Sequence, residues 1–198
     1  MAWMRKNKDF SDFKPDVNTS TWLKTSRLTR QQRLRLLKWL AYCGVLVLAL
    51  VILDSIMSQF SFFGATTDLA VCVILMITVL EGTEVGCVFV LFASTFYYFS
   101  GSAPNASCIA LLSFLGTGAT MLRQMYWHRS KGSIILCTGF ALMAYEIGLF
   151  MVGLFYELTI FSRLGVFALT GLYSCLVLIP LYPLIYKIGL IGGNTWKE

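Results

Sequence analysis

The sequence predicts an all-α, polytopic membrane protein, a bundle of six transmembrane helices with both chain ends in the cytoplasm. Three observations predict this fold. Hydrophobic residues make up 57% of the 198 residues and charged residues only 13%, and the mean hydropathy of +0.72 is far above that of water-soluble domains. The apolar residues gather in six stretches. The basic residues are concentrated before the first of these stretches.

Residues 1–38 form a basic, polar arm. They hold ten Lys or Arg against three Asp, whereas residues 39–198 hold six Lys or Arg against seven acidic residues. So polar a segment cannot bury a core, and we expect its first part to be disordered. From Ser26 onward, leucines alternate with basic residues, which predicts a helix that lies on anionic headgroups and then turns into the first span at Trp39. A solvated retention signal is the alternative, and both interpretations place the arm in the cytoplasm.

Each of the six apolar stretches is interpreted as one membrane crossing. They cover residues 39–57, 69–80, 85–99, 106–122, 134–155 and 164–185. The first contains 19 residues, which is enough to span a bilayer. Residues 39–190 therefore form the transmembrane domain, and residues 191–198 form a short cytoplasmic tail.

The second and third stretches are short, and Glu81–Glu84 separates them. Two short helices, a re-entrant hairpin or one long helix are compatible with this pattern. The basic loop Arg123–Lys131 must lie on the same side as the arm. An even number of crossings must precede that loop, which excludes one long helix and leaves the other two arrangements.

The sequence lacks the residue patterns of common catalytic and metal sites. The six cysteines fall one per stretch without a CxxC pair, and we interpret them as small core residues. The only histidine, His128, lies in the basic loop, so Ser174 has no histidine within the bilayer to activate it. We expect no enzymatic activity, no metal and no cofactor.

Glu146 is the only ionisable residue near the centre of an apolar stretch. Gly139 and Gly153 lie seven residues before and after it, so all three share one helix face that a neighbouring helix can approach closely. We expect Glu146 to face the bundle in its protonated form. It is either a packing residue or part of a proton or ion relay. Hydroxyls for its carboxyl group are expected from one stripe of the fourth stretch, formed by Ser113, Thr117 and Thr120.

Two further features are candidates for helix packing or for docking a partner. Gly82 and Gly86 form a GxxxG pair where the second and third stretches meet, which favours a tightly packed hairpin. Asp68 opens the second stretch, at the outer interface.

Several segments, taken in order, resemble the family of the rod shape-determining protein MreD. The resemblance covers roughly Leu53 to Leu190. It is carried by "LDSIMSQFSFFGATTDL", "EGTEVG", "FSGSAPN", "AYEIGLF" and "LIPLYPLIYKI". Glu146 and Asp68 match recurrent positions of that family.

The resemblance implies a non-enzymatic scaffold subunit of the rod complex, or elongasome, in the bacterial inner membrane. Such a subunit takes part in cell shape and lateral peptidoglycan synthesis. The implied partners are membrane lipid, an MreC-like protein with a single span, MreB filaments, RodA and a class B transpeptidase. No nucleic acid and no cofactor are implied.

A second function class also fits the length and the number of helices, namely the substrate-binding membrane subunit of an energy-coupling factor type importer. Such subunits often carry an AxxxA-like pair in the first span, whereas Ala41 is followed four residues later by Val45. The short, apolar outer loops also offer no obvious polar ligand pocket. The sequence therefore favours a scaffold, with a partner helix docked at Gly139, Glu146 and Gly153 or at Gly82 and Gly86.

Overall fold

The computed structural model describes residues 30–52, 55, 66–126 and 131–191. Within these ranges the chain forms six α-helices and one 3₁₀ turn, η3 (Phe161–Arg163), and contains no strand. The helices are α2 (Arg30–Ile52), α3 (Leu69–Glu81), α4 (Thr83–Phe99), α5 (Ser107–Tyr126), α6 (Lys131–Phe155) and α7 (Leu164–Gly189). The predicted all-α class is confirmed. Three segments are long and apolar enough to cross a membrane, namely Gln32–Ile52, Lys131–Phe155 and Phe161–Gly189.

Some expectations concern residues outside the described ranges. They include the arm up to residue 29, His128 and the tail from residue 192.

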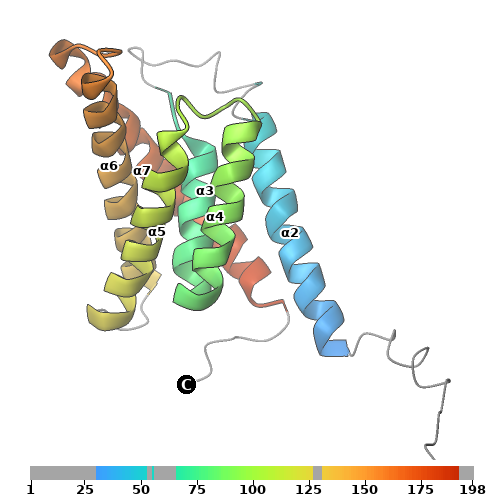
Figure 1. The fold of residues 1–198 in the computed structure, drawn as a ribbon. Helices are drawn as coiled ribbons and strands as arrows, with labels where there is room; N and C mark the ends of the chain where they lie inside the picture. Colours follow the sequence, from blue (N-terminus) through green and yellow to red (C-terminus); the bar gives the residue numbers. More distant parts are fainter. Residues whose placement is uncertain (1–29, 53–54, 56–65, 127–130, 192–198) are drawn as a thin grey trace, which may run out of the picture.

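The helices alternate in direction along the chain (Figure 1). The start of α2, the turn between α3 and α4, the end of α5, the start of α6 and the end of α7 therefore lie at one end of the bundle. We call this the basic end, because Arg123, Lys131 and Lys187 belong to it. The opposite end carries the connections between α4 and α5 and between α6 and α7.

Helix α3 occupies the centre of the bundle, where it contacts each of the five other helices (Figure 1). Every one of its residues from Ala70 to Glu81 is buried. Its 13 residues span about 20 Å, which is shorter than the roughly 30 Å hydrocarbon core of a bilayer. Because protein rather than solvent surrounds α3, its length does not have to match the thickness of a membrane.

The outer surface of the bundle is also apolar. Phe114 on α5 is 78% exposed and Phe140 on α6 is 79% exposed, and α2, α4 and α7 present similar outward-facing side chains. An apolar exterior of this extent around a helical bundle is what a lipid environment favours.

Helices α3 and α4 form a tight antiparallel hairpin. Gly82 joins them with φ of 91° and ψ of −179°, a conformation that is essentially restricted to glycine. A Cβ atom on Gly86 would lie 2.6 Å from the carbonyl oxygen of Thr78. The tight packing predicted from the GxxxG pair is therefore present, and one long helix across this region is excluded.

Helix α2 joins the end of the arm to the first apolar stretch. It runs without interruption from Arg30 to Ile52, across the expected boundary at Trp39. Leu, Arg, Gln and Lys are good helix formers, and neither Gly nor Pro occurs in α2 before Gly44. No local signal therefore opposes continuation of the helix. Lys38 lies within this helix, and its side chain points into the bundle, where the residue is 5% exposed.

Candidate functional site

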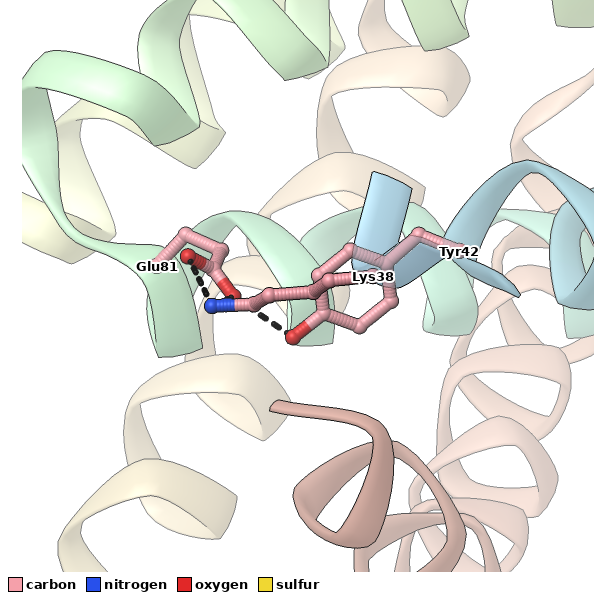
Figure 2. A network of polar contacts seen from close by, with 3 residues as sticks. All are labelled: Lys38, Tyr42 and Glu81. Atoms are coloured by element: carbon pink, nitrogen blue, oxygen red, sulfur yellow. Dashed lines mark hydrogen bonds and ion pairs between the residues drawn. The ribbon is translucent and has the colours of Figure 1, made fainter. Parts of the chain in front are cut away.

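A buried ion pair links α2 to the end of α3 (Figure 2). Lys38 Nζ lies 2.6 Å from Glu81 Oε1 and 2.8 Å from Glu81 Oε2. The Tyr42 hydroxyl donates a hydrogen bond of 2.6 Å to Glu81 Oε1. Tyr42 lies one helical turn after Lys38, so both side chains reach the same carboxylate. The carboxylate thus accepts bonds on both of its oxygens, as a buried charge requires.

A cavity of about 290 Å³ adjoins this ion pair at the basic end. Its polar lining comes from five helices, α2, α3, α5, α6 and α7, and includes Lys38, Glu81, Arg123, Lys131, Tyr182 and Tyr186. Three of these side chains are cationic and one is anionic, which gives the lining a formal charge of +2.

Besides the ion pair, two further polar side chains of the cavity are buried, Arg123 and Tyr182. Arg123 is 8% exposed, and its guanidinium donates a hydrogen bond to the carbonyl oxygen of Val79. Tyr182 stacks on Tyr186 with ring centroids 5.6 Å apart. The Tyr182 hydroxyl is buried and has no hydrogen-bond partner among the described residues. A buried hydroxyl without a partner is unfavourable, which marks this atom as a candidate ligand contact.

Asp68 joins three helices at the opposite end of the bundle. Its carboxylate accepts a hydrogen bond of 3.2 Å from the Tyr97 hydroxyl on α4. Its backbone N–H donates to Ser174 Oγ on α7, at 3.0 Å. The Ser174 carbonyl in turn accepts a weak bond from Cys72 Sγ. Ser174 therefore anchors the start of α3. From the sequence we considered it only as a nucleophile, without a histidine to activate it.

Glu146 faces the bundle as expected, and it is 3% exposed. The helix beside it is α7, because a Cβ atom on Gly171 would lie 3.4 Å from Glu146 Cγ. Among the described residues, Glu146 Oε1 has no hydrogen-bond partner.

The expectation that hydroxyls of α5 serve Glu146 is wrong. Each of them donates to a carbonyl oxygen of its own helix, a common local alternative for Ser and Thr. The bonds run from Ser113 to Ile109 at 2.6 Å, from Thr117 to Ser113 at 2.8 Å and from Thr120 to Thr117 at 2.7 Å.

The glycines around Glu146 pack against the chain itself. A Cβ atom on Gly139 would meet Cys175 Sγ of α7 at 3.5 Å, and one on Gly153 would meet Thr159 Oγ1 at 2.8 Å. Gly86 is likewise filled by α3. These positions are helix-packing sites within the bundle. At Gly86, Gly139 and Gly153 the space beside the glycine is therefore occupied by this chain and is not left open for a partner helix.

An apolar groove of about 530 Å³ runs between α5 and α6 on the outside of the bundle. The small residues Gly118, Ala119, Ala141 and Ala144 line its floor. The large side chains of Phe114 and Phe140 form its rim. Nothing lies within 4 Å of the position that a Cβ atom on Gly118 would take. No sequence motif indicated this groove, because its lining comes from two helices whose register only the fold determines.

The cysteines agree only in part with their expected role as core residues. Cys72, Cys108 and Cys137 are buried, Cys87 and Cys175 are partly buried, and Cys43 is exposed on α2. Within the described ranges, no group of three or more His, Cys, Asp or Glu residues is arranged to hold a metal ion.

Sequence reasoning missed the Lys38–Glu81 pair and the cavity beside it. It assigned Lys38 to the arm and Glu81 to a turn. The two residues are 43 positions apart in the sequence, but their side chains are in contact in the structure. The available signal was a basic residue at the start of one apolar stretch and an acid at the end of the next. No family model, curated protein or solved structure matches this chain.

Proposed function

We propose that this chain is a non-enzymatic scaffold subunit of the bacterial inner membrane, in which the α5–α6 groove binds the single transmembrane helix of an MreC-like partner. The subunit crosses the membrane six times with both termini in the cytoplasm. It belongs to the rod complex that directs lateral peptidoglycan synthesis and cell shape. Its further partners are MreB filaments, RodA and a class B transpeptidase.

The observation that carries this proposal is the α5–α6 groove. Helices associate in lipid through van der Waals packing, which requires small residues where two backbones approach. Gly118, Ala141 and Ala144 provide such a floor, and the space above Gly118 is open. Phe114 and Phe140 stand on either side of the floor and are largely exposed. A transmembrane helix that entered the groove would cover both rings.

The lining of the groove also restricts what can bind there. All nine of its lining residues are apolar or small, so the occupant must present an apolar face of its own. A transmembrane helix with small or aliphatic residues on one side meets this requirement. A polar segment would lose its hydration without gaining hydrogen bonds.

The six-span topology is supported by the alternating helix directions and by the position of the charges. Arg123 lies in the last turn of α5, Lys131 begins α6 and Lys187 lies in the last turn of α7, all at the basic end. Arg163 belongs to η3, between α6 and α7 at the opposite end. Under the positive-inside rule, the basic end faces the cytoplasm.

The test is co-purification of a tagged copy of this chain with an MreC-like single-span protein, after solubilisation in a mild detergent. Gly118→Leu places a side chain in the groove from a position where a Cβ atom meets nothing within 4 Å. It should reduce the recovered partner about tenfold. Gly44→Leu is the matched control, since Gly44 on α2 is equally open but lies outside the groove. The control should retain the partner at the level of the unmodified chain.

Both variants must first show the melting temperature of the unmodified chain in detergent. Retention of the partner by Gly118→Leu would reject the groove as its binding site. Equal loss with Gly44→Leu would show that the substitutions act through a general effect.

A further inference from the structure

We propose that the cavity at the basic end binds a phosphate group, presented in the membrane by the head group of an anionic lipid. Free inorganic phosphate offers the same chemistry, and the experiment below separates the two sources. The proposal does not depend on the scaffold function, since no part of the α5–α6 groove lines this cavity.

The charge of the lining favours an anion. Glu81 is already neutralised by Lys38 and accepts a further bond from Tyr42. The carboxylate is therefore occupied. Lys131 and Arg123, whose guanidinium also donates to the Val79 carbonyl oxygen, add two further positive charges to the lining. A guanidinium and an ammonium around one small space form a common arrangement for phosphate binding.

The Tyr182 hydroxyl provides a second and independent indication. This residue is 8% exposed and lines the cavity, and its hydroxyl lacks a partner among the described residues. Stacking on Tyr186 holds the ring in place. A phosphate oxygen in the cavity would accept a hydrogen bond from this hydroxyl and would satisfy it.

The size and position of the cavity favour a lipid head group. A volume of about 290 Å³ is at the lower limit for small-molecule sites, so it suits a head group without its acyl chains. Leu190 lines the same cavity and is 47% exposed. The cavity therefore has an apolar edge at the surface, against which an acyl chain can lie. Basic pockets between transmembrane helices are known sites for anionic lipids.

The experiment is native mass spectrometry of the full chain released from dodecyl maltoside micelles. The micelles are doped with phosphatidylglycerol or with phosphatidylcholine, or the buffer contains inorganic phosphate. The bound species are counted by mass, and dissociation constants follow from the titration. We expect phosphatidylglycerol to bind with a lower dissociation constant than phosphatidylcholine.

The variants test the two contacts separately. Lys131→Gln removes one charge and should weaken phosphatidylglycerol binding about fivefold. Tyr182→Phe removes only the hydroxyl and leaves every charge in place, and it should weaken binding about tenfold. Lys187→Gln is the matched control, because Lys187 is an exposed cation at the same end that does not line the cavity. It should change the dissociation constant less than about twofold at moderate salt.

The outcomes are distinct. Selective binding of phosphatidylglycerol with the expected variant effects supports the proposal. Binding of inorganic phosphate with the same sensitivity to Tyr182→Phe supports the phosphate site and assigns it to a soluble source. Equal binding of both lipids, or equal weakening by Lys187→Gln and Lys131→Gln, overturns it. If Tyr182→Phe does not fold, the exposed Lys131 still provides the comparison with Lys187.

Discussion

At the residue scale, the bundle contains an ion pair that is almost completely hidden from solvent. The side chains of Lys38 and Glu81 are 7% and 3% exposed. Burial of two charges costs several kcal/mol, and their attraction recovers this only when both partners and their hydrogen bonds are in place. Tyr42 completes the arrangement, since its hydroxyl donates to the carboxylate and its ring centroid lies 5.8 Å from Lys38 Nζ.

We therefore predict that Glu81→Gln lowers the free energy of unfolding by about 3–5 kcal/mol, because it leaves the Lys38 ammonium buried without a counter-charge. The double variant Lys38→Met with Glu81→Gln should recover most of this loss, since the amide can still accept the Tyr42 hydroxyl. The measurement is equilibrium unfolding in mixed micelles. Glu84→Gln, an exposed acid in the next helix, is the control and should change little. A double variant as unstable as the single one would contradict the prediction.

At the scale of the element, α3 is a short helix that is apolar on all sides. Such a helix is expected in the interior of a large protein or in lipid, and here the five surrounding helices provide the interior. Their contact with α3 depends on close backbone approach at a few positions. Gly86 is the closest of these, since its α-carbon faces the backbone of Thr78.

The prediction at this scale concerns the α3–α4 hairpin. Gly86→Ala places a methyl group where only 2.6 Å is available to a backbone oxygen, and we expect the unfolding free energy to fall by about 1–3 kcal/mol. Gly118→Ala adds the same methyl group on α5 in open space. It should be neutral or should stabilise by up to about 1 kcal/mol through helix propensity. Both are measured by unfolding in detergent, and equal effects of the two substitutions would disprove the role of close packing.

At the scale of the whole molecule, the six helices of the described ranges alternate in direction, enclose an apolar core and present an apolar exterior (Figure 1). When a helix is apolar on every side, the hydrophobic effect alone does not select which of its faces turns toward the inside of the bundle. Packing of small residues and a few polar contacts must then decide which side of each helix faces its neighbours. Asp68 with Tyr97, and Lys38 with Glu81, are such contacts.

The corresponding prediction is the orientation of the molecule in the membrane. In a variant whose native cysteines are replaced by alanine, Ser162→Cys marks the opposite end and Lys187→Cys marks the basic end; both residues are exposed. A membrane-impermeant maleimide applied to spheroplasts should label Ser162→Cys, because the positive-inside rule places the basic end in the cytoplasm. Lys187→Cys should react only after permeabilisation. The reverse pattern would invert the topology.

The sequence by itself determined the class of the protein, the approximate ends of α3 to α7 and the burial of Glu146. These features depend on composition and on apolar stretches within one segment, which can be recognised without knowledge of the neighbours. The local pair Gly82 and Gly86 also favoured a tightly packed hairpin at α3 and α4.

Only the tertiary structure decided which residues meet. It paired Lys38 with Glu81, turned the hydroxyls of α5 toward their own helix and filled the faces of Gly139 and Gly153 from within the chain. It also left open the groove at Gly118. The physical reason is that a helix with an apolar surface on every side carries no periodic signal for its inner face, so the contacts depend on how all six helices pack together.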